Sequence, residues 1–409
     1  MTRADTSPAT RRLRLAAQPA LYAGNRVQLL VGGDDYFPAL LAAIEAAARS
    51  IWLETYIFAD DRIGRRMLDA LEAAASRGVR VSLVIDGFGG GELARRLRHE
   101  LPPRGVAVHI FRPERWWRLE RKLLRRLHRK IVVVDEALAF VGGINIVDDY
   151  TEVPASGSGH RAPRYDFAVA LRGPIVAAVA LAAQRLQWTL ALAQGRKPPG
   201  PPPQVRVQRA QPAFADGVPV ALLLRDNLRH RRSVETAYLQ AIAGAREEVL
   251  IANAYFIPGR RFRRVLREAA ARGVRVRLLL QGRAEYAIQH YGQQALYGGL
   301  LAAGIEIHEY TASFLHAKVA VVDGRWATVG SSNIDPYSLL LAREANVAIH
   351  DAGFATQLRA ELERALASHS TALDRAAYAH RPWWQRARDA LAYAVLRWAA
   401  VALARGRDY

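Results

Sequence analysis

Residues 128–135 of this 409-residue chain read HRKIVVVD, and residues 316–323 read HAKVAVVD. In both stretches a histidine and a lysine stand two positions apart, and an apolar tetrapeptide separates the lysine from an aspartate. GGIN follows the first stretch at 142–145, and GSSN follows the second at 330–333, with identical spacing. Because the chain has 11 histidines and few lysines, chance gives roughly 0.1 His-x-Lys pairs. Two complete copies therefore indicate a duplicated unit.

The shared pattern predicts two strands joined by a tight turn. Residues two apart on a strand point to the same face, so each histidine should lie beside its lysine. The apolar tetrapeptide fits a buried strand, and residues 135–136 and 323–324 fit the turn into a second strand. That second strand ends at Gly143 in one copy and Ser331 in the other, where small residues let the backbone approach a ligand closely.

The similarity between the halves extends beyond these motifs. Each half has an alanine-rich helical segment, a strand-like apolar run, and an amphipathic helix ending in RGVRV, where glycine caps the helix and valines begin a strand. Strand–helix–strand order in both halves indicates an α/β fold with largely buried sheets. The matched segments are 40–48 and 237–245 for the helix, 51–58 and 249–256 for the strand, and 77–81 and 272–276 for RGVRV.

We therefore predict two α-β-α sandwich domains related by a pseudo-twofold axis, with the active site in the cleft between them. A proline- and glycine-rich stretch at 194–203 marks the boundary, because proline blocks helix and strand hydrogen bonding. The predicted domains are 1–197 and 198–381, each with one motif, followed by a basic and aromatic helical tail at 382–409.

Composition restricts the classes of partner. Apolar residues make up 51% of the chain, which is enough for a sizeable core, and 58 basic against 38 acidic residues give a net charge of +20. Such a charge favours nucleic acid, an acidic membrane surface or phosphorylated substrates. The lack of cysteine excludes disulfides, thiolate metal sites and cysteine nucleophiles.

The two ends of the chain carry different signals. Residues 1–30 lack the apolar block of a signal peptide or membrane anchor. No uncharged apolar run reaches the roughly 18 residues of a spanning helix, and the nearest candidate, 390–404, is broken by Arg397. Trp383 and Trp384 beside it fit a helix lying in a membrane interface, and equally a terminal helix that closes the protein's own core.

Paired histidines, lysines and asparagines in one cleft suit chemistry at a phosphodiester. Ammonium groups and amides stabilise the negative charge that develops at phosphate oxygens. One imidazole can attack phosphorus and form a phosphohistidine, while the other protonates the leaving alcohol and activates the incoming alcohol or water. This scheme needs no cofactor or metal, and no cluster at metal-ligand spacing is evident. The residues are His128, Lys130 and Asn145 in one half and His316, Lys318 and Asn333 in the other.

Each half also carries a carboxylate at the start of a later apolar strand, Asp166 in the first half and Glu344 in the second. An acid that enters a buried strand beside the cleft can hold a histidine in its reactive tautomer. A salt bridge to a neighbouring arginine, Arg164 or Arg343, would explain each carboxylate equally well.

These residues resemble the phospholipase D superfamily, whose signature H-x-K-x4-D, followed by a glycine-rich step and an asparagine, occurs twice per chain. The resemblance covers nearly the entire sequence. The stretches 127–135, 139–145, 254–258 and 330–335 are similar to those of bacterial cardiolipin synthases, and in particular to the shorter ones without an N-terminal transmembrane hairpin.

The resemblance implies that a phosphatidyl group moves from phosphatidylglycerol, or a related phospholipid, through a histidine to a second lipid alcohol, giving cardiolipin and glycerol. It implies His128 as the nucleophile and His316 as the general acid/base, although the pseudo-symmetry also allows the reverse. The lysines and asparagines would bind the phosphate.

For the remaining signature residues the sequence allows more than one role. Asp135 and Asp323 complete the catalytic signature, but their spacing puts them at the far end of the strand, which fits a structural role at the turn equally well. Ser331 stands where the other copy has Gly143, and its hydroxyl would add a donor to the phosphate site.

A basic segment with interleaved tryptophans and leucines, 112–128, leads into the first motif and contains Trp116 and Trp117. This composition fits a membrane-surface element that guides lipid to the cleft, and also a solvated basic helix. We expect a peripheral enzyme on the cytoplasmic face of the bacterial inner membrane, with anionic phospholipid as its partner.

Three rival functions remain at this stage. A nuclease would also act on a phosphodiester and suits a charge of +20, but the apolar residues within the basic segment argue against nucleic acid. A phospholipase would let water take the phosphatidyl group, and residue types do not separate water from alcohol. A non-enzymatic membrane scaffold conflicts with the intact pair of motifs.

Overall fold

The computed structural model describes residues 19–99, 103–112, 126–150, 162–195, 203, 212–226 and 230–404. Two predicted features lie largely outside these ranges, namely the tryptophans of the basic segment 112–128 and most of the proline-rich stretch 194–203.

The two halves of the chain contain matching elements. The first half has strands β1 (Leu21–Val31), β2 (Ser50–Thr55), β3 (Arg80–Asp86), β4 (Val106–Phe111), β5 (Lys130–Val134), β6 (Leu138–Gly142) and β7 (Phe167–Arg172), with helices α2 (Gly32–Glu45), α3 (Arg62–Ser76), α4 (Gly91–His99) and α5 (Ile175–Ala193). The second half has strands β8 (Val218–Arg225), β9 (Glu248–Asn253), β10 (Arg275–Gln281), β11 (Glu306–Tyr310), β12 (Lys318–Val322), β13 (Trp326–Gly330), β14 (Glu344–His350) and β15 (Ser370–Ala372). Its helices are α6 (Ser233–Gly244), α7 (Arg260–Ala271), α8 (Ala287–Leu301), α9 (Pro336–Leu340), α10 (Ala352–His369), α11 (Arg375–Ala379) and α12 (Trp383–Ala404).

All of these strands belong to one mixed sheet with the order β15-β11-β10-β9-β12-β13-β14-β8-β1-β7-β6-β5-β2-β3-β4. Read outward from the central β8–β1 pair, the two arms match strand for strand, β7 with β14, β6 with β13 and so on to β4 with β11, and β15 at the edge of the second half has no counterpart. An antiparallel pair at the centre relates the arms by a local twofold axis. The predicted α/β class and duplicated architecture are confirmed.

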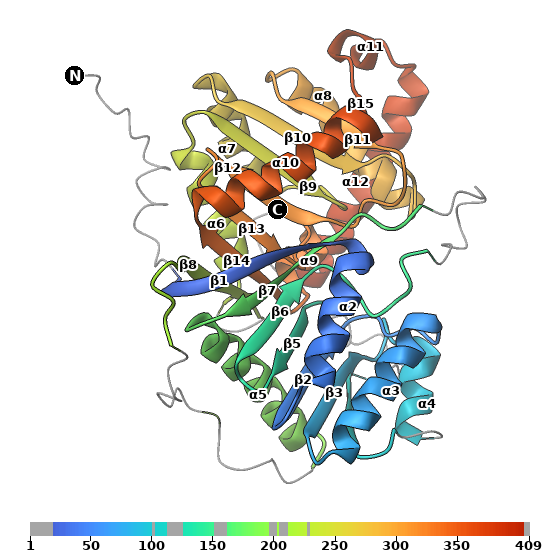
Figure 1. The fold of residues 1–409 in the computed structure, drawn as a ribbon. Coiled ribbons are helices and arrows are strands. Elements are labelled where there is room, and N and C mark those ends of the chain that lie inside the picture. The colour runs from blue at the N-terminus through green and yellow to red at the C-terminus, as the bar shows by residue number, and fades with distance from the viewer. Residues whose placement is uncertain are drawn as a thin grey trace.

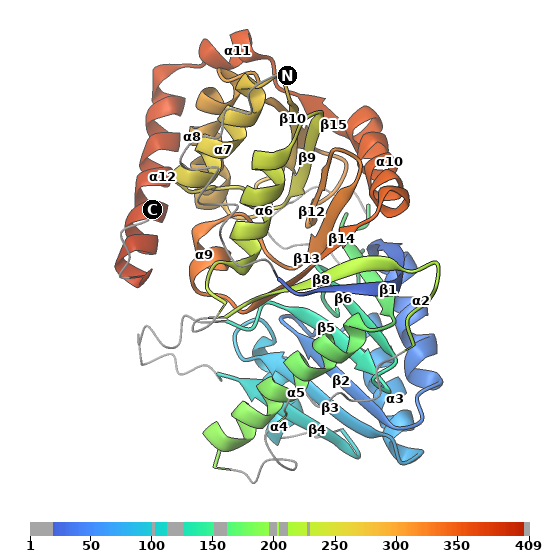
Figure 2. The same cartoon turned by 90° about the vertical axis from the view of Figure 1, so that its left-hand side faces the viewer.

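Helices cover both faces of this sheet (Figures 1 and 2). In the first half, α2, α3 and α4 lie on one side of the strands and α5 on the other, and α6, α7 and α8 face α10 across the strands of the second half. One hydrophobic core lies beneath α2–α4 and another beneath α6–α8. A third core is shared, because it contains residues of α5, of α10 and of strands from both halves.

The join between the halves depends on β1 and β8, which the sequence patterns did not reveal. β1 pairs with β7 on one edge and with β8 on the other. Buried Asn25 fastens this junction, since its Nδ2 donates to the carbonyl of Val218 (3.2 Å) and its Oδ1 accepts from the amide of Ile175 (2.8 Å).

α5 is the one described helix long and apolar enough to cross a membrane by length and composition. More than half of its apolar stretch is buried inside the protein, against strands of the sheet (56%). A buried core helix passes the same test, so α5 is weak evidence for a span. Arg185 interrupts the apolar stretch of α5, so α5 contains no uncharged apolar run of spanning length.

The predicted motif hairpins are confirmed. β5 pairs antiparallel with β6, and β12 with β13. Asp135 and Glu136 turn the first hairpin with φ values of 54° and 55°, and Asp323 and Gly324 turn the second with 51° and 58°. Two successive left-handed residues match the twist of the flanking strands, which is why such turns suit two-residue hairpins.

Both motif aspartates accept backbone hydrogen bonds that connect parts of the fold. The carboxylate of Asp135 accepts the backbone N–H groups of Ala48, Arg49 and Ser50 at 2.7–2.8 Å. Asp323 does the same for residues 246–248 at 2.9 Å. Each aspartate thus ties its hairpin turn to the loop entering β2 or β9, at the end of the strand away from the histidine. The structure supports their structural role and does not bring them to the histidines.

We predict that Asp323→Ala lowers the free energy of unfolding by about 1–3 kcal/mol, since the backbone N–H groups of residues 246–248 lose their shared acceptor. The activity of the protein that stays folded should change less than tenfold. Urea unfolding and a parallel activity assay with His316→Ala as reference measure both effects. Unchanged stability, with a loss of activity as large as that of His316→Ala, would contradict the structural role.

Candidate active site

The two motif histidines stand immediately before β5 and β12, where the halves meet. The amide of His128 donates to the carbonyl of Arg343 (2.9 Å), and the amide of His316 donates to the carbonyl of Tyr165 (2.9 Å). These contacts form short parallel bridges between the halves, Leu127 with Arg343 and Tyr165 with Leu315. Each motif is therefore aligned by the segment that leads into a strand of the other half.

The same crossing pairs each histidine with a carboxylate of the opposite half. His128 Nδ1 lies 3.0 and 3.1 Å from the two carboxylate oxygens of Glu344, and His316 Nδ1 lies 2.6 Å from Asp166 Oδ2. The carboxylate side chains are 0% and 5% exposed, whereas the imidazoles are 15% and 16% exposed. Both carboxylates thus contact a histidine, as one of the two sequence interpretations proposed, and they do so across the junction.

The charges at these pairs are set by burial and by the lysines. Burial by itself would raise the pKa of Asp166, but Lys318 and His316 outweigh it, so this pKa lies below its usual value. Glu344 behaves alike, with His128 and Lys130 opposing burial. An ionised carboxylate at Nδ1 keeps the proton on that nitrogen and leaves Nε2 as the reactive one.

The lysines are buried between the two pairs. Lys130 and Lys318 are 3% and 0% exposed, and Lys318 Nζ lies 3.9 Å from Asp166 Oδ2. Each Nζ also donates to the carbonyl of its own motif histidine. Burial lowers the pKa of Lys130 to about 7 and that of Lys318 to about 8. A phosphate entering the site would raise both values, because negative charge favours the ammonium form.

The two motifs share one site. Burial lowers the pKa of both histidines, and that of His128 is lowered further by Lys130 and Lys318, one from each half. The pKa of His316 is likewise lowered by Lys318 and Lys130. Each imidazole therefore lies in the field of the other half's lysine.

The small residues after the motifs make room for the carboxylates. A Cβ at Gly143 would overlap the carboxylate of Asp166, so only glycine fits there. Ser331 donates its hydroxyl proton to Glu344 Oε2 (2.5 Å) and accepts from the amide of Ala345 (3.0 Å). A hydroxyl has a single proton to donate. In the structure this hydroxyl therefore holds Glu344, the carboxylate partner of His128, and donation by Ser331 to phosphate stays a prediction.

The predicted asparagines are both buried beside the motifs, at 4% exposure. Asn145 accepts the amide of Ile57 through its Oδ1 at 3.1 Å, whereas the Oδ1 of Asn333 is buried without a hydrogen-bond partner. Phosphate binding by their amide nitrogens, and by the lysines, stays a prediction.

The sequence analysis missed two residues at the first half-site. The Tyr56 ring lies 4.9 Å from the imidazole of His128. Buried Asp86 accepts the amide of Leu127 at 2.7 Å, and burial raises its pKa to about 6. In the structure Tyr56 directly follows β2 and Asp86 ends β3, so a position at the carboxyl end of a strand is a signal that could have selected them. At the matching positions the second half has Ala254 and Gln281, so the two half-sites are not equivalent.

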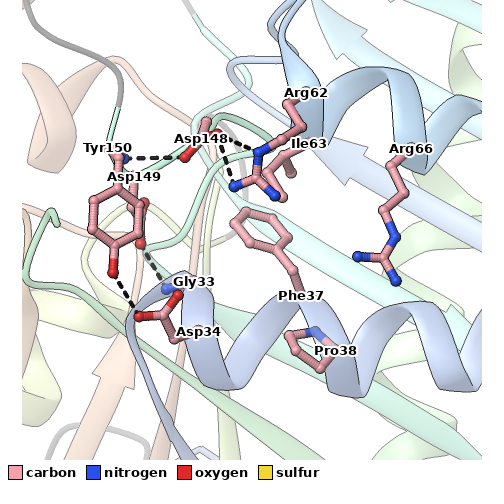
Figure 3. A pocket seen from close by; sticks show the side chains of 10 residues that line it. All are labelled: Gly33, Asp34, Phe37, Pro38, Arg62, Ile63, Arg66, Asp148, Asp149 and Tyr150. Atoms are coloured by element: carbon pink, nitrogen blue, oxygen red, sulfur yellow. Dashed lines mark hydrogen bonds and ion pairs between the residues drawn. The ribbon is translucent and has the colours of Figure 1, made fainter.

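A separate small pocket of about 130 Å³ lies between the starts of α2 and α3 (Figure 3). Asp149 accepts the amide of Gly33 at 2.6 Å, and Tyr150 donates to Asp34 at 2.9 Å, so its polar groups bind one another. Burial raises the pKa of Asp149 to about 7, and the charge of Asp166 adds to this. The pocket therefore borders the histidine site, but no motif residue lines it.

Two fused α/β units, each giving one His-x-Lys motif to a common site, define a phospholipase D-type enzyme. No group of three or more His, Asp or Glu that could hold a metal ion occurs among the residues that the structure describes.

Comparison with known proteins identifies the family within this class of enzyme. The family model described as "Cardiolipin synthase, PLD-like domain" matches residues 40–153 and 238–366. Cardiolipin synthase B of Escherichia coli is 40% identical over 383 residues, covering 91% of this chain and 88% of that protein. Cardiolipin synthase A of Pseudomonas fluorescens is 34% identical over 352 residues, covering 86% and 70%.

The fold has a counterpart among solved structures. Phosphatidylserine synthase of Haemophilus influenzae superposes with a TM-score of 0.70 at 14% identity, covering 96% of this chain and 98% of that one. The chain thus belongs to the cardiolipin synthase family of the phospholipase D superfamily, and is an enzyme of the phosphatidyltransferase class.

We predict that Asp166→Asn and Glu344→Gln each lower kcat by about 10²–10⁴-fold, because an amide at Nδ1 favours the wrong imidazole tautomer. Asp148→Asn is the matched control, since Asp148 lies nearby, outside the motifs, and pairs with Arg62. Initial rates on phospholipid and circular dichroism of each variant make the comparison. Near-normal rates in the first two variants would show that Asp166 and Glu344 do not hold the histidines in the reactive tautomer.

Proposed function

We propose that this enzyme moves a phosphatidyl group from one phosphatidylglycerol to a second, forming cardiolipin and releasing glycerol, through a phosphohistidine. The observation that carries the proposal is the pair of imidazole–carboxylate contacts at one shared site, His128 with Glu344 and His316 with Asp166. The family membership supports the choice of lipid substrate.

In the first half-reaction, Nε2 of His128 attacks phosphorus and the P–O bond to the glycerol headgroup breaks. The negative charge of the bound phosphodiester favours the imidazolium form of His316. This imidazolium gives its Nε2 proton to the departing oxygen, so that glycerol leaves as a neutral alcohol. Lys130 and Lys318 stabilise the charge on the non-bridging oxygens, and Glu344 stabilises the imidazolium formed on His128.

In the second half-reaction, His316 takes the proton from a headgroup hydroxyl of the second phosphatidylglycerol. The resulting oxygen attacks phosphorus, and the P–N bond to His128 breaks. Cardiolipin is released, and both imidazoles return to their starting state.

We further propose that the enzyme acts peripherally on the cytoplasmic face of the bacterial inner membrane. Its net charge of +20 suits an anionic phospholipid surface. Its substrates and product are bilayer lipids, so the active site has to meet them at that surface.

The direct test is incubation of the purified protein with headgroup-labelled phosphatidylglycerol vesicles. We expect cardiolipin and free glycerol in equal amounts, and neither from His128→Ala or His316→Ala. Phosphatidic acid as the main product would replace transfer by hydrolysis. Cleavage of a plasmid, with no lipid turnover, would favour a nuclease, and vesicle binding without any turnover would favour a scaffold.

A p-nitrophenyl phosphodiester tests which histidine is the nucleophile, because p-nitrophenolate leaves without being protonated. We expect His316→Ala to release one equivalent of p-nitrophenolate and to carry the phosphoryl group on residue 128 by mass spectrometry. His128→Ala should release none. An adduct on residue 316 in His128→Ala would reverse the assignment.

A further inference from the structure

α12 has one buried face and one exposed apolar face. Ala392, Leu396 and Asp389 are buried, and Leu396 lies beside Gly292 of α8. Figure 2 shows α12 on the outside of the second half, alongside α8. The opposite face is exposed and includes Trp383 (79%), Trp384 (52%), Leu391 (67%), Val395 (43%) and Trp398 (75%).

Four of these exposed side chains form one stripe, and Trp383 lies beside its first residue. Positions 384, 391, 395 and 398 are separated by seven, four and three residues, which places them on one side of an α-helix. Trp383 to Trp398 covers about 22 Å of helix axis. Large apolar side chains gathered in this way on a water-facing helix mark an interaction surface rather than scattered exposure.

Charge on α12 selects among the partners of such a surface. Its sole acidic residue, Asp389, is 2% exposed and is paired with Arg381 (2.7 Å) and Arg388 (2.9 Å). Arg386 is exposed at the start of the helix. The exposed face therefore carries no free negative charge, and it combines tryptophan with arginine, the combination that suits the headgroup region of an anionic bilayer.

α12 runs back along α8 toward the active site. Tyr378, which precedes α12, lies against Tyr297 in the second half of α8 (ring centroids 5.8 Å apart), whereas Leu396 of α12 lies beside Gly292, closer to the start of α8. α12 also contacts α9, which follows the second motif.

The segment before α8 connects this surface to the site. Tyr286, 57% exposed, lies near Tyr255, with the two tilted rings 6.3 Å apart between centroids, and it adds to the raised pKa of Tyr56 at the His128 half-site. Ile288, 43% exposed, continues the apolar surface at the start of α8. Exposed apolar groups therefore occur both on α12 and at the start of α8, and Tyr286 at the start of α8 acts on Tyr56 beside His128.

We propose that the exposed face of α12, continued by Tyr286 and Ile288, is the surface by which the enzyme lies on an anionic lipid bilayer with its active site facing the membrane. This inference rests on the proposed function in that it supplies lipid to the same site. α12 thus has both roles that the sequence left as alternatives. Its exposed face lies on the membrane, and its buried face closes the core of the second half.

The test compares Leu391→Glu and Trp398→Glu with Leu192→Glu, an exposed leucine (50%) on α5. Binding is measured by co-sedimentation with vesicles of phosphatidylglycerol and phosphatidylethanolamine. We expect the two α12 variants to bind vesicles at least about tenfold more weakly than the unaltered protein, because an apolar contact with the bilayer is replaced by a charge that the anionic surface repels. The control variant should bind normally. Unfolding midpoints check that all three variants fold.

Activity on two forms of phosphatidylglycerol separates docking from chemistry. The α12 variants should lose turnover on vesicles and keep it on a short-chain, monomeric phosphatidylglycerol. Undiminished vesicle binding, or equal loss in Leu192→Glu, overturns the docking surface. A dimer that forms without lipid and that the α12 variants convert to monomer would also overturn it, because the α12 face would then bind a second copy of the chain. Absence of transferase activity on both substrates, with vesicle binding still sensitive to α12, would reject the proposed function and leave the surface standing.

Discussion

The exchange of carboxylates across the twofold junction is the contact on which the site depends. His128 is oriented by Glu344 and His316 by Asp166, so neither half holds a complete imidazole–carboxylate pair by itself. The backbone bridges at Arg343 and Tyr165 fix the same crossing. Duplication within one chain is therefore more than two copies of a site, because each half supplies the carboxylate that contacts the histidine of the other.

This exchange requires the halves to be rigidly joined. The β1–β8 pair makes one continuous sheet, and the core shared by α5 and α10 packs on both arms of it. A buried core of this kind resists small displacements, because close-packed side chains cannot shift without opening cavities. The distance between His128 and Glu344 thus depends on this distant packing as well as on the backbone bridge between Leu127 and Arg343.

The two half-sites have diverged within this frame. Asp166 approaches over Gly143, where no side chain fits, while the longer Glu344 is held by the hydroxyl of Ser331. Tyr56 lies against His128, but alanine occupies the matching position near His316. In the proposed two-step transfer one imidazole acts as nucleophile and the other carries the proton. The asymmetry of the half-sites provides a physical basis for assigning these two roles to different histidines.

The sequence alone determined the duplication, the α/β class, the motif hairpins and the histidines and lysines, because strand periodicity, turn chemistry and repeated spacing are local properties. It also named Asp166 and Glu344, but left open whether each meets an arginine or a histidine. Only the tertiary structure decided that they cross between halves, that Ser331 serves Glu344, and that Asp135 and Asp323 fasten loops. These are contacts between residues far apart in the chain, and they follow from the β1–β8 junction, which no local pattern encodes.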